Sequence, residues 1–506
     1  MRIYCLLFCW LNLLYFSHCA KILGIFPFPT YSHYILGSRI MKEMVKRGHE
    51  VTFISFFKEP TLIKNYNEIV LPIKKGEKEE IISLHFGNKL SATDNIDLVL
   101  QFNTVFADLL FKNHEFKQIL NESFDLIVYD VFTTHIYTAL GHHFKCPVVL
   151  LSTTPPSIYT NFVMGNPHYS SYVPNLVSPY PTVMNLWQRF FNIYYDIYAL
   201  YQLYMKTIPA ENEILQQSLG PMPHLKDLMY NASLMLCNSH PSINVPAPVV
   251  PGIKEIAGAH IHLDPKRLPE NLREILDKSF EGVILISMGS ILESSLIPKE
   301  RKDIFFNVIK KFPKRFLWKY EESVKHQPDN LLISEWIPQL EVLAHPNVIA
   351  FVSHCGAFSV IESIYYGVPL ICIPVYADQF INGNYAFEKQ YGLTIPYREL
   401  TEEKLTKALE KILKDSKFQE KAREHSEILR STPQKPMDTA TFWLEYVIRH
   451  KGALHLRTAV LNLKWYQIFM FDIILLLFLL ILTLFSLHFV FKYGYKRITL
   501  HLKKNK

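Results

Sequence analysis

The sequence predicts two α/β domains, each built on a doubly wound parallel sheet, and a membrane-spanning helix near the C-terminus. In both halves of the 506-residue chain, short apolar runs typical of buried strands alternate with amphipathic segments typical of helices. A proline-containing stretch at 246–269 separates these halves and predicts a linker. An apolar run at 468–491 is long enough to span a bilayer.

The composition narrows the class of partner. Hydrophobic residues make up 49% of the chain and aromatic residues 14%, which indicates a membrane segment or an apolar ligand. The net charge of +7 is concentrated at the C-terminus, where residues 492–506 carry six lysines or arginines and no acid. Charges in the rest of the chain nearly balance, so nothing points to a nucleic-acid partner.

The cysteines are too few and too widely spaced for a zinc site or a dense disulfide framework. Three of the seven fall in the first twenty residues. The others are Cys146, Cys237, Cys355 and Cys372. One bridge among these four is compatible with the sequence, whereas for Cys355 itself we expect a small packed thiol.

Residues 1–20 have the features of a secretory signal peptide. They contain one early arginine, an apolar run and a small residue at Ala20. An uncleaved anchor is the alternative. We expect cleavage near Ala20 because a strand has to begin immediately after it, although His18 fits the cleavage pattern poorly.

The first domain is expected at 21–245. A strand at 21–26, a helix at 31–47 and a strand at 50–56 form a βαβ unit, which is typical of a doubly wound parallel sheet. The unit lacks a GxGxxG motif, which disfavours binding of NAD or FAD. His33 follows the first strand, at the edge where such sheets bind ligands, and an imidazole there is able to accept a proton. A solvent-facing histidine near a helix start is the plainer interpretation of the residue alone.

Two further features of the first domain bear on function. Asp130 ends an apolar strand at 124–129, whereas Asp125, near the start of that strand, fits a turn. Aromatic residues crowd the stretch 155–215. Core packing, a pocket for a lipophilic ligand and contact with a bilayer surface all fit this stretch.

The second domain is expected at 270–450 and opens with a helix at 270–278 and a strand at 282–287. Gly289, in the turn after that strand, permits close approach of the backbone to a ligand. The hydroxyl of Ser290 is placed to reach a phosphate. Each domain therefore begins like a mononucleotide-binding unit.

The stretch 336–384 contains a second strand–turn–helix–strand unit. An apolar strand at 348–353 leads through a tight turn into a helix at 357–366, and Gly367 follows where a C-terminal glycine belongs. A strand at 370–374 comes next, with Asp378 and Gln379 in the loop after it. The turn presents free backbone N–H groups at a helix N-terminus, an arrangement that suits a diphosphate.

These residues resemble the signature of the UDP-glycosyltransferase family, which runs from W-x-P-Q through H-x-G and a glutamate to a closing D-Q. The matching residues are Trp336, Pro338, Gln339, His354, Gly356, Glu362, Asp378 and Gln379. The resemblance is tightest over 336–384 and looser over 21–58 and 124–133. It implies the GT-B fold, in which two Rossmann-like domains face each other across a cleft.

The resemblance assigns the nucleoside of a UDP-sugar to three residues. Trp336 offers a flat face to uracil, Gln339 would bond the ribose or the base, and Glu362 would accept ribose hydroxyl hydrogens. Considered singly, these residues also fit structural roles, in the core or on a solvated helix face.

The resemblance assigns the diphosphate and the sugar to other residues of the signature. His354 and Gly356 would lie at the phosphate end. Many animal members have an asparagine near the position that Phe358 occupies in this chain. The side chain of Phe358 cannot donate to phosphate. Backbone N–H groups and the Ser359 hydroxyl would therefore carry that contact. Asp378 and Gln379 would hold the sugar hydroxyls.

The implied reaction is transfer of a hexose from a UDP-sugar to a small lipophilic hydroxyl compound, with inversion. His33 would deprotonate the acceptor, and Asp130 would orient the imidazole and stabilise its protonated form. No metal ligand set is visible, and no cofactor is implied besides the UDP-sugar. Glucose is the favoured sugar. One alternative is a glucuronate donor, whose carboxylate would need a cation that the sequence does not place. The other is a non-catalytic lumenal binding protein.

The ends of the chain predict a single-pass type I protein of the endoplasmic reticulum. The basic tail at 492–506 would lie in the cytosol and the catalytic domains in the lumen. Residues 503–506 resemble a dilysine retrieval signal, although a basic stop-transfer flank explains most of the tail. Asn121 and Asn231 stand in N-x-S motifs and are candidate glycosylation sites.

Overall fold

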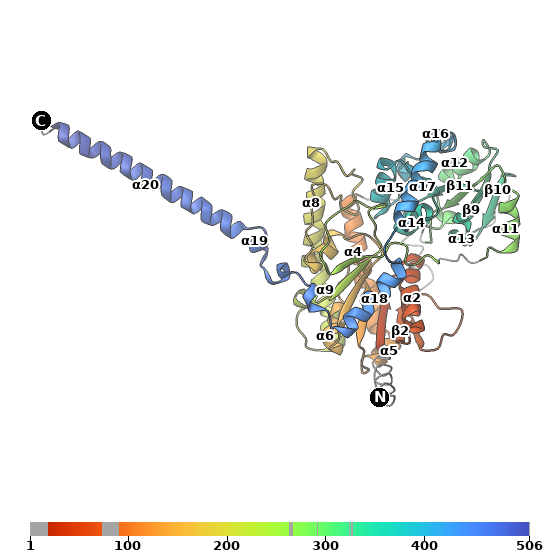
Figure 1. Cartoon of the computed structure of the whole chain (residues 1–506), viewed down its shortest axis with the longest axis horizontal. Coiled ribbons are helices and arrows are strands. Elements are labelled where there is room, and N and C mark those ends of the chain that lie inside the picture. Colours follow the sequence, from red (N-terminus) through yellow and green to blue (C-terminus); the bar gives the residue numbers. More distant parts are fainter. Residues whose placement is uncertain are drawn as a thin grey trace, which may run out of the picture. The chain divides into compact units, whose positions relative to one another are not determined.

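The computed structural model describes residues 19–72, 91–262, 267–290, 292–322, 324 and 327–504 (Figure 1). The predicted signal peptide therefore lies almost entirely outside the described residues. The chain divides into two compact units, Met1–Arg457 and Thr458–Lys506, and the first unit holds two parallel sheets.

The first sheet has seven parallel strands in the order β3-β2-β1-β4-β5-β6-β7. They are β1 (Lys21–Phe26), β2 (Glu50–Ser55), β3 (Tyr66–Val70), β4 (Leu126–Asp130), β5 (Val148–Ser152), β6 (Leu234–Cys237) and β7 (Ile253–Glu255). The central strands are apolar on both faces because helices cover both sides of a parallel sheet. β7 lies inside the predicted linker, where a three-residue strand among prolines carries too weak a pattern to be predicted.

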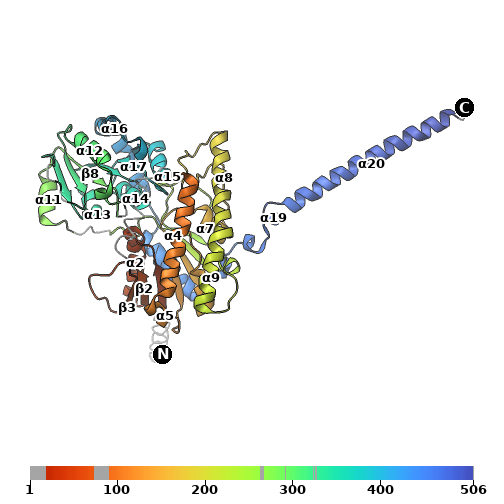
Figure 2. The ribbon, with the colours of Figure 1, turned by 180° about the vertical axis from the view of Figure 1, so that it is seen from behind.

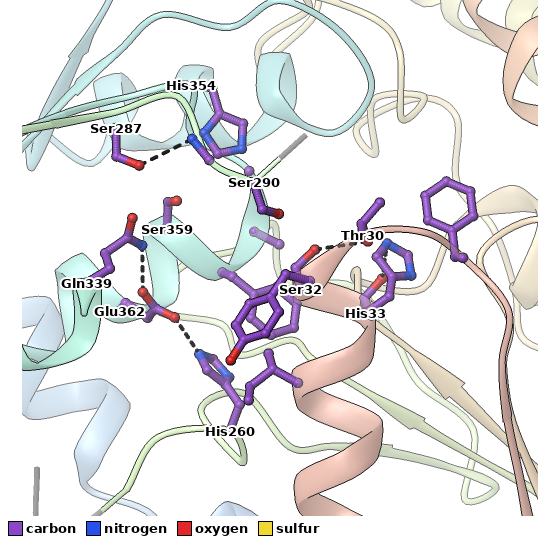
Figure 3. Close-up of a pocket in the computed structure, with 18 of the residues that line it drawn as sticks. Thr30, Ser32, His33, His260, Ser287, Ser290, Gln339, His354, Ser359 and Glu362 are labelled. Carbon is purple, nitrogen blue, oxygen red and sulfur yellow. Dashed lines mark hydrogen bonds and ion pairs between the residues drawn. The ribbon is translucent and has the colours of Figure 1, made fainter. Parts of the chain in front are cut away.

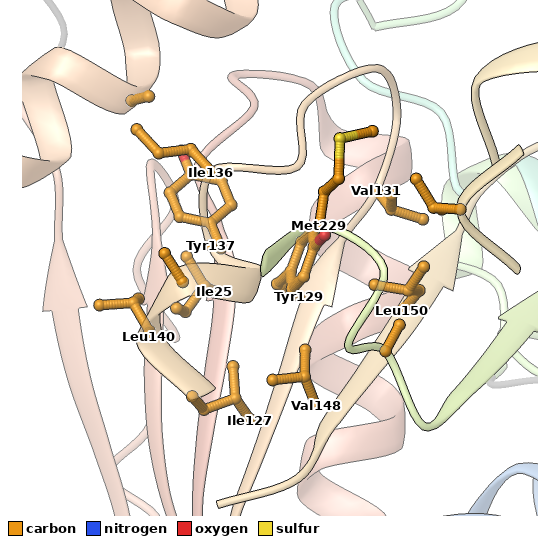
Figure 4. Close-up of a cluster of buried hydrophobic side chains, with 14 of the residues drawn as sticks. Ile25, Ile127, Tyr129, Val131, Ile136, Tyr137, Leu140, Val148, Leu150 and Met229 are labelled. Carbon is orange, nitrogen blue, oxygen red and sulfur yellow. The ribbon is translucent and has the colours of Figure 1, made fainter. Parts of the chain in front are cut away.

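Helices connect these strands as crossovers. They are α2 (Tyr31–Lys46), α4 (Ala92–Lys112), α5 (His114–Ile119), α6 (Thr138–Phe144), α7 (Ile158–Met164), α8 (Leu186–Gln202), the π-helical turn η1 (Leu203–Thr207), α9 (Ile208–Leu219) and α10 (Leu225–Leu228). Ser91 starts α4 with a capping box that includes Asp94. Figure 4 shows part of the core beneath the sheet, where Tyr129 and Tyr137 pack among aliphatic side chains.

The second sheet has six parallel strands in the order β10-β9-β8-β11-β12-β13. They are β8 (Val283–Ser287), β9 (Arg315–Lys319), β10 (Leu331–Ser334), β11 (Val348–Ser353), β12 (Leu370–Cys372) and β13 (Gly392–Thr394). Its helices are α11 (Glu270–Asp277), α12 (Lys299–Ile309), α13 (Gln339–Leu343), α14 (Ala357–Tyr365), α15 (Gln379–Glu388), α16 (Glu402–Lys414) and α17 (Ser416–Arg430), with short 3₁₀ turns η2 (Ser294–Leu296) and η3 (Tyr397–Glu399). Gly367 ends α14 with a φ of 68°, as predicted.

The final helix of this unit, α18 (Pro436–Arg449), returns to the first sheet. It packs on α2 and β7, and Ala440, Leu444 and Val447 join the core cluster that contains Ile22 of β1. Two segments therefore connect the two halves of the first unit. One is the segment after β7, and the other is α18.

One predicted loop is partly wrong. We expected Asp378 and Gln379 in the loop after the strand at 370–374, but α15 begins at Gln379 and runs through Gly383. Gly383 packs tightly on the sheet, because a Cβ there would lie 3.1 Å from the Thr394 hydroxyl and 3.3 Å from the Cys372 Cβ. The glycine therefore marks a close approach of the helix to the sheet and does not interrupt the helix.

The first unit closes with the short turn η4 (Leu454–Leu456), and the second unit consists of the turn η5 (Ala459–Asn462), then α19 (Trp465–Ile468) and α20 (Phe471–Lys504). The segment Phe471–His501 is long and apolar enough to cross a membrane, with a mean hydropathy of 2.9 in its most apolar window. The helix predicted at 468–491 is thus present and begins three residues later than expected.

Candidate active site between two sheets

A cavity of about 410 Å³ opens where the carboxyl ends of the two sheets face each other (Figure 3). Residues after β1 and β5 line one side, and residues after β8, β11 and β12 line the other. Loops at the carboxyl ends of parallel strands are the usual ligand sites of such sheets. Both halves of the unit therefore contribute to one site.

His33 and Asp130 form a buried pair at the edge of this cavity. His33 stands in the first turn of α2, and Asp130 ends β4, the neighbour of β1 in the sheet. The His33 Nδ1–H donates to Asp130 Oδ2 at 2.6 Å, and the two side chains are only 9% and 2% exposed. The carboxylate thus fixes the ring orientation and leaves Nε2, which lies 3.3 Å from the Thr153 hydroxyl, as the nitrogen free to accept a proton.

Aromatic rings surround His33. Phe28 and Phe132 lie 4.7 Å and 5.3 Å from the imidazole centroid, and Phe106 packs edge-on against Phe28. All three rings line the cavity, together with Phe102. Of the described residues that line this cavity, none belongs to the aromatic stretch 155–215. The apolar end of the cavity is thus built by the segments after β1 and β4 and by α4.

The turn after β11 is held by a disulfide. Cys355 lies at a φ of 60° and is bonded to Cys372, the last residue of β12, across a Cα–Cα distance of 5.3 Å. Our prediction of a packed thiol at Cys355 is wrong, because adjacent strands β11 and β12 bring its sulfur against that of Cys372. The bond ties the turn to the neighbouring strand.

His354 occupies the centre of that turn and requires two glycines. A Cβ at Gly289 would come within 2.6 Å of the imidazole ring, and a Cβ at Gly356 within 2.7 Å. Burial and the nearby Lys319 ammonium lower the pKa of His354 to about 4, against the opposing effect of a hydrogen bond to Ser287. The ring is therefore neutral at physiological pH in the ligand-free protein.

Lys319 is a cation at this end of the site that we did not predict. It ends β9 and lines the cavity, and its ammonium bonds Glu321 Oε1 at 2.5 Å. The other oxygen of Glu321 accepts the Ser295 N–H, which holds the pair in place. An ammonium has three donors, so Lys319 keeps capacity for an anionic ligand.

Asp378 and Gln379 line the cavity beside the start of α14. Asp378 Oδ2 accepts the Ala357 N–H at 3.0 Å and the Asn382 amide at 2.7 Å, and burial raises the pKa of Asp378. Gln379 Oε1 accepts the N–H groups of residues 375 and 376, so its NH₂ group is the part left to face a ligand.

A second polar cluster lies around Glu362, about two turns into α14. Gln339 Nε2 donates to Glu362 Oε2 at 2.6 Å, and His260 Nε2 lies 3.2 Å from Oε1. The Arg39 guanidinium donates to the His260 carbonyl, and the Phe358 ring lies 4.5 Å from the His260 ring. Residues from both halves therefore orient this carboxylate.

Trp336 forms the outer wall beside this cluster. Its side chain is 55% exposed, and Tyr31 of the first half packs edge-to-face on it at 5.2 Å. An exposed indole held at its edge leaves a flat face for a ring ligand.

The structure brings nearly all the predicted residues together. The predicted residues that line the cavity are His33, Ser290, Trp336, Gln339, His354, Gly356, Ser359, Glu362, Asp378 and Gln379. Asp130 lies behind His33. The lining residues that we did not predict include Tyr31, Arg39, Thr153, His260 and Lys319. Tyr31 is two positions from His33, but nothing in the sequence alone pairs it with Trp336.

The candidate glycosylation sites lie outside this cavity. Asn121 follows α5 and Asn231 precedes β6, and both residues are exposed. Their exposure is what the modification would require.

Comparison with known proteins gives a consistent picture. Residues 20–505 match the model of the family described as UDP-glucoronosyl and UDP-glucosyl transferase. The chain is 30% identical over 491 residues to UDP-glucosyltransferase 2 of Dactylopius coccus, covering 96% of this chain and 94% of that protein. It is 29% identical over 503 residues to UDP-glucuronosyltransferase 1A10 of Homo sapiens, covering 95% and 93%.

Solved structures share the fold at lower identity. UDP-glucose: anthocyanidin 3-O-glucosyltransferase in complex with UDP superposes with a TM-score of 0.58, at 18% identity, over 86% of this chain and all of that one. The glycotransferase of kitacinnamycin gives a TM-score of 0.54, at 16% identity, over 85% and 98%. The predicted GT-B arrangement of two facing Rossmann-like domains is confirmed.

Proposed function

This chain belongs to the family of UDP-glucuronosyl and UDP-glucosyl transferases, and we propose that it transfers glucose from UDP-glucose to a hydroxyl of a small lipophilic acceptor. The observation that carries the proposal is the buried His33–Asp130 pair, which shares one cavity with the uridine- and phosphate-binding signature. A proton acceptor and a nucleotide site on opposite sides of one cavity are what a single displacement requires.

In the proposed mechanism, the acceptor hydroxyl lies against His33 Nε2 and gives up its proton as its oxygen attacks the anomeric carbon. Asp130 stabilises the imidazolium that forms, because it lies 2.6 Å from Nδ1. The attack is in line with the bond to UDP, so the configuration at the anomeric carbon inverts. The proton taken by His33 is later released to solvent.

The leaving diphosphate is stabilised by the turn at His354 and by the N-terminus of α14. Trp336 stacks on the uracil, and Glu362 accepts ribose hydroxyls between Gln339 and His260. Phe358 has no polar group, and Lys319 offers a positive charge near His354. We assign Lys319 to the diphosphate.

Glucose is favoured over glucuronate by the roles of the cations among the described residues that line the cavity. Lys319 is assigned to the diphosphate, and Arg39 donates to the carbonyl of His260, which bonds the ribose-binding Glu362. Neither cation is therefore left for a hexuronate carboxylate at Asp378 and Gln379. The acceptor is assigned as lipophilic because phenylalanines surround His33.

We further propose that the first unit lies in the lumen of the endoplasmic reticulum and that α20 spans its membrane. The Cys355–Cys372 disulfide fits an oxidising compartment. The apolar segment of α20 has the length of a span, and the basic residues that follow it fit a cytosolic end.

A turnover assay on membranes tests the proposed function. Wild-type chain and His33→Ala would be offered a panel of phenols with UDP-glucose and, separately, with UDP-glucuronate. We expect glucoside formation that is at least roughly 10²-fold slower in His33→Ala, with little product from UDP-glucuronate. Product only from UDP-glucuronate would reverse the donor assignment. UDP binding without turnover across the panel would favour the alternative of a binding protein.

A further inference from the structure

Helix α8 has its polarity reversed. The buried residues on its face toward the protein are Asn192, Asp196, Ala199 and Gln202, three of them polar. Its opposite face is apolar and exposed. The side chains there that are between 48% and 68% exposed include Leu186, Trp187, Phe190, Ile193, Ile197 and Tyr201. We call this set the α8 face. A helix of a water-soluble surface has the opposite arrangement.

Polar contacts hold α8 in this orientation. Asn192 donates to the carbonyls of Ser170 and Val173 at 2.8 Å and 2.9 Å. Asp196 accepts from the Asn175 amide at 2.7 Å and from His168 Nε2 at 3.1 Å. These groups are satisfied, so rotating the helix to bury its apolar side would leave them without partners. The exposure of the α8 face is therefore fixed by the fold.

We propose that the α8 face docks on the lipid bilayer that α20 spans, so that the first unit lies against the membrane surface. This inference rests on the proposed membrane anchoring by α20. A contiguous patch of exposed large apolar side chains on a protein surface marks an interaction site. The following contacts favour a bilayer as the occupant.

The first unit ends close to the α8 face. Arg457, its last residue, donates to the Tyr230 carbonyl at 2.9 Å, and the Tyr230 hydroxyl lies 2.5 Å from that of Tyr204. Tyr204 belongs to η1, which directly continues α8. The stretch 458–470, which separates Arg457 from α20, spans at most about 45 Å when fully extended. The surface of a bilayer crossed by α20 thus lies within about 45 Å of Arg457, which contacts the segment that continues α8.

The chemistry of the α8 face matches the border between acyl chains and headgroups. It combines aliphatic side chains with Trp187 and Tyr201, whose polar tips suit that border. The one acid of α8, Asp196, is buried. Two exposed cations, Arg189 and Lys206, flank the face and suit lipid phosphates.

Docking in this way would also bring the acceptor end of the cavity near the lipid. α8 packs on α4, the two helices lie side by side in both views (Figures 1 and 2), and Val99, Phe102 and Phe106 of α4 line the cavity. A lipophilic acceptor dissolved in the bilayer would then lie beside the helix that forms this wall.

The test uses the full chain reconstituted in nanodiscs of phosphatidylcholine and phosphatidylserine. An environment-sensitive fluorescent amino acid replaces Ile197 on the α8 face or, as the control, Glu403 on α16, where the side chain is 74% exposed. Quenching is measured with aqueous iodide and with a lipid that carries a nitroxide on its acyl chain. Both positions are exposed, so neither replacement disturbs the core.

We expect the probe at position 197 to be quenched at least several-fold more by the nitroxide lipid than by iodide, and the probe at 403 to show the reverse. Equal quenching of both probes by iodide would overturn the proposal. Protection of position 197 from both quenchers would also overturn it, since a second copy or another protein would then cover the face. Only chains inserted through α20 are measured, so a failure of anchoring is seen separately as a failure to enter the discs.

Discussion

Replacing Asp130 by asparagine tests the catalytic pair without changing its shape. The carboxylate lies 2.6 Å from His33 Nδ1, and both side chains are buried. Two unit charges about 4 Å apart interact by about 4 kcal/mol at an effective dielectric constant near 20. If that energy stabilises the imidazolium in the transition state, its loss lowers kcat by roughly 10³-fold. His33→Ala removes the base itself, and we expect kcat to fall by roughly 10²- to 10⁴-fold.

The assay is UDP release with a phenol acceptor, measured for both single variants and for the double variant. Because the two residues act as one unit, the double variant should be no slower than His33→Ala alone. The KM for the UDP-sugar should change little, because neither side chain contacts the nucleotide. Asp125→Asn is the matched control, since Asp125 directly precedes β4, is exposed and accepts the Lys21 N–H outside the cavity.

Two results would refute this reasoning. One is a wild-type kcat in Asp130→Asn, which would show that the carboxylate has only a structural role. The other is a double variant whose loss equals the product of the two single losses, which would show that the residues act independently.

Three further predictions concern binding and stability. Trp336→Ala should weaken UDP binding by a factor of roughly 5 to 150, the range expected for loss of one base–aromatic stack. Calorimetry would measure it, and unchanged affinity would rule out the stacking role. Cys372→Ser should lower stability by about 3 kcal/mol, since the Cys355–Cys372 bond closes a loop with a sequence separation of 17. A reductant should lower the thermal midpoint of the wild type and leave the variant unchanged, and an equal response in both would contradict the prediction. Burial raises the pKa of Glu211 from 4.5 to about 8, so the folded state holds this proton while the unfolded state releases it. Wild-type stability should therefore fall as pH rises from 4.5 to 8, by roughly 5 kcal/mol in total, with no further loss from this group above that range. Glu211→Gln should lack this slope when thermal midpoints are compared across the interval, and identical slopes would refute the assignment.

Much of the fold could be predicted because buried parallel strands leave a strong local pattern. The strands at 21–26 and 348–353 have the predicted structure at the predicted bounds. The start of α15 at Gln379 was missed because Asp378 and Gln379 come soon after a strand and were expected in the loop that follows it. The close packing of Gly383 on β12 and β13 depends on contacts that no local pattern reveals.

The candidate site divides in the same way. Apart from Ser290, the predicted second-half residues lie within 336–384, so their spacing identified them together. His260, Tyr31 and Lys319 enter the site only when the two sheets face each other. For the aromatic stretch 155–215 the sequence left core packing, a ligand pocket and bilayer contact open, and only the structure shows that one side of α8 is apolar and exposed.

The most direct measurement of the central claim is the anomeric configuration of the product formed from UDP-α-glucose, determined by NMR. Direct in-line attack by an acceptor that His33 has deprotonated predicts only the β-glucoside from the wild-type chain, formed roughly 10²- to 10⁴-fold more slowly by His33→Ala. An α-glucoside would contradict this mechanism, because retention requires a second displacement or attack from the face of the departing UDP.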